Sequence, residues 1–269
     1  INIIQMELDL KNKRVFISGS TSGIGYATAK QLLIEGATVI INGRTQSTID
    51  DAVNRLKNET KSENISGISS DFSNTESVNA LIKQLGKIDV LINNVGIYEP
   101  SDFIEISDQD WYRFFDVNVM SGIRLSRAVF PDMLAQNWGR IIFITSESAS
   151  NIPDEMIHYG TTKAAIHAVS RGLAELTKNT NVTVNTIMPG PTASEGVEAF
   201  FNKLATEQNS DYETFEKDFF KNMRPSSLIQ RFAKPEEVAN LITYISSPLS
   251  SATNGAALRV DGGVVKTIF

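Results

Sequence analysis

Short apolar runs, rich in β-branched residues, alternate with amphipathic stretches along nearly the whole chain. The apolar runs cover residues 15–17, 38–41, 65–68, 90–92, 141–144, 182–184 and 257–260. Between them, stretches such as residues 24–35 and 77–85 have the spacing of helices that bury one face. Short continuous apolar strands are typical of a parallel sheet covered on both faces. The alternation therefore predicts an α/β fold of repeated βαβ units, in a single domain over residues 1–269.

One segment, around residues 193–231, interrupts this alternation. It separates a strand that we expect to end near Met188 from a helix that we expect to begin near Pro235. Two interpretations fit: an extra helix pair that packs its aromatic side chains on the core, or a helical lid over a substrate pocket at the carboxyl ends of the strands. The aromatic residues of the segment are Phe200, Phe201, Tyr212, Phe215, Phe219 and Phe220.

Composition excludes several classes of function. The chain has 269 residues, 41% of them hydrophobic, which suits an ordinary folded core. With 25 Lys and Arg against 31 Asp and Glu, its net charge of −6 disfavours a nucleic-acid partner. It has no cysteine, so disulfides, thiolate nucleophiles and cysteine-bound zinc are excluded. Neither His158 nor His167 has a second ligand at metal spacing, so we expect no metal site.

No apolar run reaches the roughly 20 residues of a membrane helix, so we expect no membrane partner. The first residues, 1–6, lack the basic and apolar regions of a secretion signal. We therefore expect a cytoplasmic protein. Met6 is a candidate start, with residues 1–5 as an upstream extension.

A loop rich in glycine and hydroxyl groups follows the first predicted strand and opens a helix. Glycine permits backbone conformations and close approaches that other residues hinder. The amino terminus of a helix offers free N–H groups and a positive dipole end, which suit a pyrophosphate. A plain strand-to-helix turn is the alternative, because the glycine spacing differs from the commonest dinucleotide pattern. The predicted cofactor contacts in this loop are Gly19, Ser20, Thr21, Ser22, Gly23, Ile24 and Gly25.

The end of the second predicted strand bears on the choice of cofactor. About 20 residues after the glycines, an NAD site usually has a carboxylate for the ribose 2′-hydroxyl. This chain has Arg44 there. A guanidinium can bind a 2′-phosphate through a forked, charge-assisted contact, so Arg44 favours NADP(H), with NADPH preferred over NADH. A solvated surface arginine is the alternative interpretation.

A tyrosine and a lysine stand four residues apart, as Tyr159 and Lys163. On a helix their side chains share a face. A tyrosine has a pKa near 10 in peptides and is a poor base at neutral pH. A nearby ammonium stabilises the phenolate, so we expect Lys163 to lower the pKa of Tyr159. The pair is then able to exchange protons with a substrate.

Taken together, these motifs resemble the short-chain dehydrogenase/reductase family over nearly the whole chain. The resemblance implies a doubly wound, Rossmann-type parallel sheet of about seven strands with helices on both faces, and a homodimer or homotetramer. The matching motifs are Ser18-Gly19-x-x-x-Gly23-Ile24-Gly25, Asn93-Asn94-Val95-Gly96, Asn118, Ser146, Tyr159 with Lys163, Pro189-Gly190-Pro191-Thr192 and Asp261-Gly262-Gly263.

The resemblance also implies roles for single residues. Tyr159 would exchange a proton with the substrate oxygen, and Ser146 would polarise the same oxygen. Lys163 would hold the cofactor ribose and tune Tyr159, while Asn118 would hold a water that links Lys163 to solvent. The further cofactor contacts that it implies are Asp71, Phe72, Asn93, Gly96, Pro189, Gly190 and Thr192.

We therefore expect an NADP(H)-dependent oxidoreductase that interconverts a carbonyl and a secondary alcohol on a small or medium-sized molecule. One alternative is a 3-oxoacyl-carrier-protein reductase. The positions where such enzymes present arginines to their acidic carrier look like Pro131 and Glu175 here, which disfavours it. The other alternative is a non-catalytic nucleotide-sensing protein, disfavoured because Tyr159 and Lys163 are both present.

Two neighbours of Ser146 leave questions open. Ser148 is a rival for the polarising hydroxyl. Glu147 is unusual in a loop beside a reacting oxygen. It either points to solvent or recognises a polar or basic group of the substrate.

Overall fold

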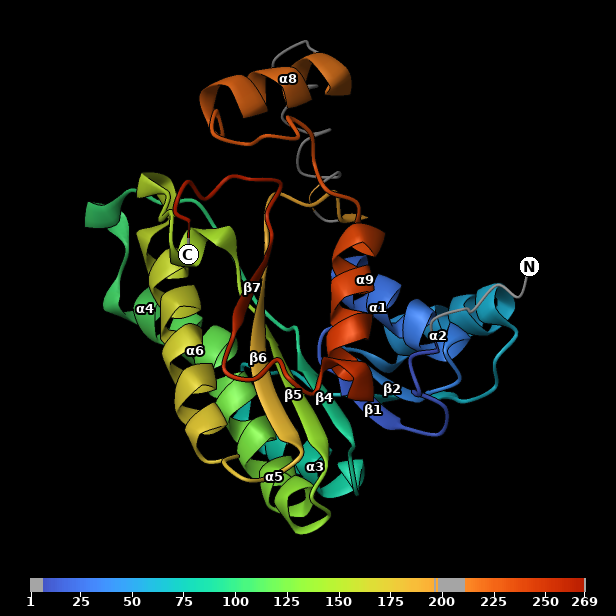
Figure 1. Cartoon of the computed structure of the whole chain (residues 1–269). Coiled ribbons are helices and arrows are strands. Elements are labelled where there is room, and N and C mark those ends of the chain that lie inside the picture. Colours follow the sequence, from blue (N-terminus) through green and yellow to red (C-terminus); the bar gives the residue numbers. More distant parts are fainter. Residues whose placement is uncertain (1–6, 196, 198–210, 269) are drawn as a thin grey trace.

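The structure is a computed structural model that describes residues 7–195, 197 and 211–268. At its centre lies a parallel sheet of seven strands in the order β3-β2-β1-β4-β5-β6-β7 (Figure 1). This order confirms the doubly wound, Rossmann-type α/β fold expected from the sequence. The strands are β1 Arg14–Ile17, β2 Thr38–Gly43, β3 Ile65–Ser69, β4 Val90–Asn93, β5 Gly139–Ile144, β6 Val182–Pro189 and β7 Ala257–Val260.

The first strand, β1, shows why the apolar runs become central strands. Val15, Phe16 and Ile17 are fully buried, although neighbouring residues point to opposite faces. Only a sheet covered on both sides buries such a run. β1 pairs with β2 on one side and with β4 on the other. The strand order therefore reverses beside β1, and ligands of such sheets bind outside the carboxyl ends of the strands at this point.

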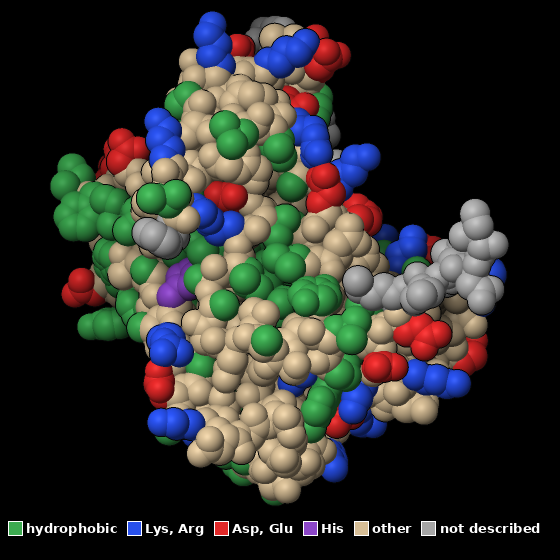
Figure 2. All heavy atoms as spheres, in the orientation of Figure 1, with side chains coloured by type: hydrophobic (Ala, Val, Ile, Leu, Met, Phe, Trp, Pro, Cys, Tyr) green, Lys and Arg blue, Asp and Glu red, His purple; other side chains and the backbone are tan. Residues whose placement is uncertain are grey.

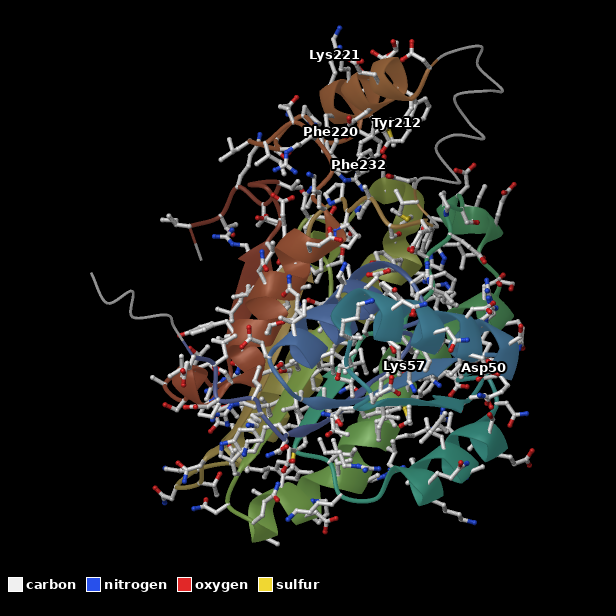
Figure 3. The ribbon with its side chains drawn as sticks, turned by 90° about the vertical axis from the view of Figure 1, so that its right-hand side faces the viewer. Asp50, Lys57, Tyr212, Phe220, Lys221 and Phe232 are labelled. Carbon is white, nitrogen blue, oxygen red and sulfur yellow. The ribbon has the colours of Figure 1, made fainter. Side chains whose placement is uncertain are left out.

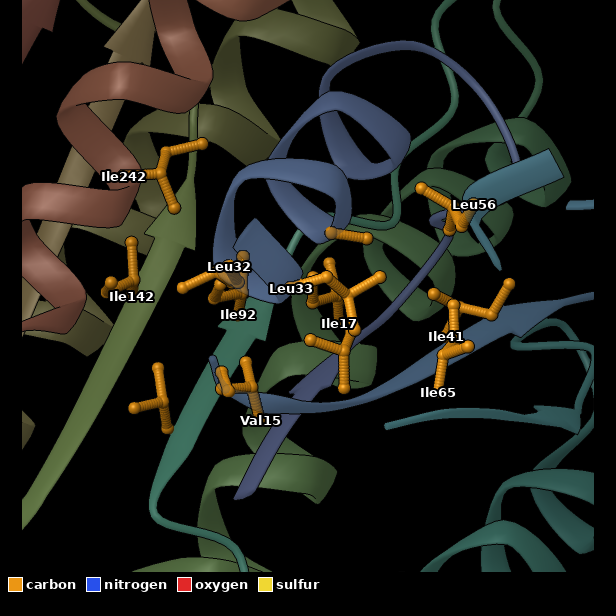
Figure 4. Close-up of a cluster of buried hydrophobic side chains, with 14 of the residues drawn as sticks. Val15, Ile17, Leu32, Leu33, Ile41, Leu56, Ile65, Ile92, Ile142 and Ile242 are labelled. Atoms are coloured by element: carbon orange, nitrogen blue, oxygen red, sulfur yellow. The ribbon is translucent and has the colours of Figure 1, made fainter. Parts of the chain in front are cut away.

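Two sets of helices cover the two faces of the sheet. On one face, leucines and isoleucines of the first set pack on strand residues such as Ile17 and Ile142 (Figure 4). A second apolar cluster fills the opposite face, around Phe16 and Phe143. The first set is α1 Gly23–Ile34, α2 Gln46–Thr60 and α9 Pro235–Ser246, and the second is α3 Thr75–Leu85, α5 Ser121–Ala135 and α6 Ile157–Glu175.

The amino ends of the helices differ in a way that matters for the site. Thr45 caps α2 and Asn74 caps α3, each by accepting a hydrogen bond from a backbone N–H of the first turn. α1 begins after Ser22, whose side chain makes no such bond, and its first turn has no acidic residue. The free N–H groups of α1 therefore remain available to an anion from elsewhere.

A π-helical turn interrupts the long helical stretch before α5. α4, Asp108–Phe114, leads into η2, Phe115–Met120, and α5 follows directly. Such turns are rare and occur mostly near functional sites. Asn118 lies in this turn and is 2% exposed.

Helix α8, Tyr212–Asn222, stands apart from the two helical layers (Figure 1). Tyr212, Phe220 and Phe232 gather beneath it (Figure 3), and Phe220 is 1% exposed. Side chains of both charges lie on the outer surface at this end of the molecule (Figure 2). The aromatic residues thus form a cluster of their own rather than joining either face of the sheet. Phe200 and Phe201 lie outside the described residues.

No helix in the described ranges has the length and apolarity that crossing a bilayer requires.

Candidate active site

A cavity of about 1080 Å³ lies where the central strands end. Ser146 follows β5, Gly96 follows β4, and Tyr159 and Lys163 project from α6. The loop after β1 forms one wall, and Phe215 and Phe219 of α8 form another. The catalytic residues expected from the sequence thus converge with the glycine loop, except that Asn118 does not line the cavity itself.

Lys163 is buried deep in this site, with 4% of its surface exposed. Its Nζ donates a hydrogen bond to the carbonyl of Ile144 at 3.1 Å and lies 5.6 Å from the centre of the Tyr159 ring. Burial lowers the pKa of Lys163 to about 8, because a buried ammonium loses hydration. The residue therefore titrates near the physiological range.

Tyr159 has the opposite shift from the one expected. Burial raises its pKa above the ordinary value, and the nearby carboxylate of Glu147 raises it further. A hydrogen bond with Ser146 and the charge of Arg224 act in the lowering direction, but burial outweighs them. The expectation of a lowered pKa is thus not met by the chain alone. At neutral pH the phenol keeps its proton and is able to donate it.

The hydroxyl beside Tyr159 belongs to Ser146. Ser146 Oγ donates a hydrogen bond of 2.5 Å to Glu147 Oε2, and it also interacts with Tyr159. Ser148 is 2% exposed, and its Oγ donates to the same oxygen of Glu147 at 3.1 Å. The geometry therefore favours Ser146 over Ser148 as the polarising hydroxyl.

Glu147 does not point to solvent. It is 4% exposed and lines the cavity. Its Oε1 lies 3.3 Å from Nε of Arg224, which follows α8 in the chain. Arg224 Nη1 also lies 3.6 Å from a carboxylate oxygen of Glu155. No sequence pattern predicts this arrangement, because Glu147 and Arg224 are 77 residues apart.

Asn118 holds the irregular segment that follows β4. Its Oδ1 accepts from the N–H of Ile97 at 2.7 Å, and its Nδ2 donates to the Ile97 carbonyl and to Thr162 Oγ1, each at 3.0 Å. The carbonyl oxygen and the amino group of the Asn118 side chain thus both form hydrogen bonds within the protein. These hydrogen bonds hold the segment after β4 against α6, close to Lys163, and they were not foreseen from the sequence.

The glycine loop has the shape of a phosphate cradle. Gly19 adopts φ +59°, a conformation that favours glycine. A Cβ on Gly25 would lie 2.8 Å from the Gly19 carbonyl, so the loop closes tightly only with glycine there. Asn42 Oδ1 accepts from the Gly19 N–H, and Asn94 Nδ2 donates to the Gly19 carbonyl. These two asparagines are supporting residues that the sequence reasoning did not assign.

The carboxylate of Glu195 binds to this phosphate cradle. The N–H of Gly23 donates a hydrogen bond of 2.6 Å to Glu195 Oε2, although the two residues are 172 positions apart. A carboxylate is a stand-in for a phosphate oxygen, since both are anionic acceptors. The amino end of α1 therefore binds anionic oxygen, and a dinucleotide pyrophosphate fits the residues present.

Three of the predicted cofactor contacts point away from the cavity. Ser20 is fully buried, and its hydroxyl donates to the carbonyl of Ile17 and accepts from the N–H of Asn42. Phe72 packs in the apolar cluster around Phe16. Asn93 donates to Ser126 of α5. These three side chains are buried and contact other residues of the protein instead of facing the cavity.

Arg44 and Asp71 are exposed where β2 and β3 end, and Arg44 is close enough to affect Asp71. Hydrogen bonds from Ser73, together with the charge of Arg44, hold the pKa of Asp71 below its usual value. Asp71 therefore stays ionised. The two side chains lie at the edge where the adenosine end of a dinucleotide would be expected.

In a comparison with known protein families, residues 13–205 match the short chain dehydrogenase family. The chain belongs to the short-chain dehydrogenase/reductase family. It is an oxidoreductase that acts on CH–OH groups with NAD(P), as the resemblance implied.

Several members of the family match almost end to end. The uncharacterized oxidoreductases YvaG and YvrD of Bacillus subtilis are 46% and 47% identical to this chain, over 98% of it and 100% of each relative. The crystal structure of L-sorbose reductase from Gluconobacter frateurii, complexed with NADPH and L-sorbose, is similar with a TM-score of 0.91. It is 29% identical, over 98% of this chain and 100% of that one.

Within the described ranges, no group of three or more His, Asp or Glu side chains could hold a metal ion. His158 packs instead against Phe114, with ring centres 4.0 Å apart, and His167 Nδ1 lies 3.0 Å from Thr186 Oγ1. Both histidines thus contact neighbouring side chains of this short-chain dehydrogenase/reductase.

Proposed function

We propose that the protein is an NADP(H)-dependent oxidoreductase that interconverts a carbonyl and a secondary alcohol on a small or medium-sized molecule. One observation carries the proposal. The phenol of Tyr159, the hydroxyl of Ser146 and the ammonium of Lys163 meet in a cavity whose wall is the phosphate cradle. The proposed proton donor and the proposed dinucleotide site thus line the same cavity.

Tyr159, Ser146 and Lys163 have separate roles in the reaction that we propose for this cavity. When bound, the nicotinamide supplies the hydride. Tyr159 holds a proton at its phenol oxygen and donates it to the carbonyl oxygen of the substrate. Ser146 directs a second hydrogen bond to the same oxygen and stabilises the charge that develops there. Lys163 places a positive charge beside the ring of Tyr159, which favours the phenolate left after donation.

The proposed cofactor site extends the cavity along the sheet edge. Gly19, Ser22, Gly23 and Ile24 line the cavity on the cradle side, and Pro189, Gly190 and Thr192 line it beyond β6. Arg44, exposed after β2, supports a preference for NADPH, since a guanidinium matches a 2′-phosphate. The complex of the Gluconobacter L-sorbose reductase with NADPH is in keeping with this preference.

We further propose that the segment around residues 193–231 is a lid, of which the structure describes residues 193–195, 197 and 211–231. Phe215 and Phe219 of α8 and Arg224 beyond it line the same cavity as Tyr159. The lid is rich in acidic residues, and Pro131 and Glu175 offer no positive charge to an acidic carrier protein. A free, small substrate therefore fits better than an acyl carrier.

The test of this function is consumption of NADPH, followed by absorbance, with a panel of ketones, aldehydes and ketoses. We expect turnover with some of them and slower turnover with NADH. Arg44→Ala should raise the Kd for NADPH about tenfold or more, because it removes a charge-assisted hydrogen bond. The Kd for NADH should stay within a factor of about two. Tighter binding of NADH than NADPH by the wild type would contradict the cofactor preference.

A further inference from the structure

Glu147 is a buried carboxylate inside the catalytic cavity, and the proposed proton transfer does not use it. Its Oε2 accepts three hydrogen bonds: from Ser146 Oγ at 2.5 Å, from the Ser148 N–H at 2.8 Å and from Ser148 Oγ at 3.1 Å. Its Oε1 faces Nε of Arg224 at 3.3 Å. Both oxygens thus have a hydrogen-bond partner within the protein, although the residue lines the cavity.

The hydrogen bond from Ser146 cannot survive the reaction. A serine hydroxyl has one hydrogen, and Ser146 gives it to Glu147. To polarise a carbonyl oxygen, Ser146 must turn that hydrogen toward the substrate. Glu147 Oε2 then loses one of its donors while it stays buried, which is costly for a charged acceptor. A substrate with its own hydrogen-bond donor can replace the lost hydrogen bond to Glu147 Oε2 and so removes this cost.

The position of that donor follows from the distances. A carbonyl oxygen that accepts from Ser146 Oγ lies about 2.8 Å from it. Since Glu147 Oε2 lies 2.5 Å from the same Oγ, at most about 5 Å separates the carbonyl oxygen from the carboxylate oxygen. A hydroxyl on the carbon next to the carbonyl lies within this span and can bridge the two.

The charge around Glu147 favours a neutral donor over an ammonium group. Arg224 is 7% exposed and balances the carboxylate of Glu147 from the lid side. Lys163 supplies a second positive charge, 5.6 Å from the centre of the Tyr159 ring. A hydroxyl satisfies Oε2 without adding a third cation to this enclosed space.

We propose that Glu147 is a specificity-determining residue that accepts a hydrogen bond from a hydroxyl on the carbon next to the reacting carbonyl. The preferred substrates are then α-hydroxy ketones, or vicinal diols in the reverse direction. The inference rests on the proposed function, which supplies the carbonyl at Ser146 and Tyr159. Arg224 is a positioning residue that holds Glu147 in place from the lid.

Three matched ketones test the inference with the wild-type enzyme and NADPH. 2-Butanone lacks a hydroxyl, 1-hydroxy-2-butanone has it next to the carbonyl, and 4-hydroxy-2-butanone has it one carbon further away. We expect kcat/KM for 1-hydroxy-2-butanone to exceed the other two at least about tenfold, because a hydrogen bond to a charged group is restored. Equal kcat/KM values for the three ketones would overturn the inference.

Glu147→Gln tests whether this carboxylate causes the preference. The amide keeps the shape but removes the charge and turns half of the group into a donor. We expect the ratio of kcat/KM for 1-hydroxy-2-butanone to that for 2-butanone to fall at least about fivefold. The control is Glu155→Gln, which removes another carboxylate near Arg224 with no contact to Ser146. Whatever its effect on rate, it should keep the ratio within a factor of about two.

The outcomes separate the inference from the proposed function. Turnover of plain ketones with no preference for the adjacent hydroxyl would overturn the inference and leave the proposed function standing. A preference that survives Glu147→Gln would also overturn it. Failure to consume NADPH with any carbonyl of the panel would remove the proposed function and the inference with it.

Discussion

Tyr159 and Lys163 show how burial sets up a proton donor. The cavity raises the pKa of the phenol and lowers that of the ammonium to about 8. Both shifts favour the neutral form, because a neutral group loses less on leaving water. The site at rest thus holds a protonated tyrosine beside a lysine that titrates easily. It is prepared for carbonyl reduction at neutral pH.

Cofactor binding should therefore depend on pH through Lys163. Its amine is charged below about pH 8 and neutral above it. Because the ammonium is proposed to hold the cofactor ribose, the Kd for NADPH should begin to rise as pH increases through about 8. Fluorescence titration of NADPH from pH 6 to 9.5 measures this. Lys163→Met should bind weakly with no such rise, and a constant Kd in the wild type up to pH 9.5 would refute the role.

Ser146 and Ser148 allow a matched comparison at the same carboxylate. Both hydroxyls donate to Glu147 Oε2, but only Ser146 interacts with Tyr159. Ser146→Ala should lower kcat/KM for carbonyl reduction by about 10²–10³, the effect of losing one donor to a developing oxyanion. Ser148→Ala should lower it far less. Steady-state kinetics of the two variants measures both values of kcat/KM. A larger loss of kcat/KM in Ser148→Ala than in Ser146→Ala would show that Ser148 polarises the substrate oxygen.

Several segments of the chain line the site, and α8 of the lid stands apart from the two helical layers (Figure 1). Glu195, at the beginning of the lid segment, occupies the N–H of Gly23 in the phosphate cradle. A pyrophosphate needs this N–H as well. We therefore expect binding of the cofactor to require release of Glu195.

Glu195→Gln should tighten NADPH binding. The variant removes a competing charge from the amino end of α1, which predicts a Kd about two- to fivefold lower. Glu213→Gln is the control, because this exposed carboxylate of α8 pairs with Lys217 instead. Isothermal titration of both variants against the wild type measures the effect. An unchanged or higher Kd for Glu195→Gln would show that Glu195 does not compete with the cofactor.

The aromatic cluster of the lid should unfold separately from the core. Phe220 and Phe232 form a cluster distinct from the two that cover the sheet. Phe220→Ala should thus speed proteolysis within residues 211–223 and lower kcat/KM, while the melting temperature changes little. Ile242→Ala, in the main core, should instead lower global stability by about 2–5 kcal/mol. A similar loss of global stability in both variants would show that the lid belongs to the main core.

At the scale of the whole molecule, the sheet brings together residues that are far apart in the chain. The reversal of strand order beside β1 places the ends of β1 and β4 next to each other. The glycine loop and Gly96 therefore share one cavity, with Ser146 from β5 along the same edge. The order of strands thus brings the proposed cofactor site next to the loop of Ser146, and α6 adds the proposed proton donor Tyr159.

The sequence predicted those features that depend on local pattern. Buried strands follow from apolar runs such as residues 15–17, and the pair Tyr159 and Lys163 follows from helical spacing. The direction of a side chain within a loop does not follow from pattern. Ser20 turned inward because Ile17 and Asn42 offer it partners.

Contacts between distant segments were also beyond prediction. The buried pair of Glu147 and Arg224 depends on where the lid returns to the sheet. The same holds for Glu195 on Gly23. A charged residue in the lid has many possible partners, and only the folded chain selects one of them.

The most direct test of the account is Tyr159→Phe, measured for both NADPH binding and carbonyl reduction. The substitution removes one oxygen and keeps the ring in place. We predict a Kd for NADPH within about twofold of the wild type and a kcat/KM for reduction at least about 100-fold lower, the usual contribution of a general acid. Turnover within about tenfold of the wild type would show that another group donates the proton.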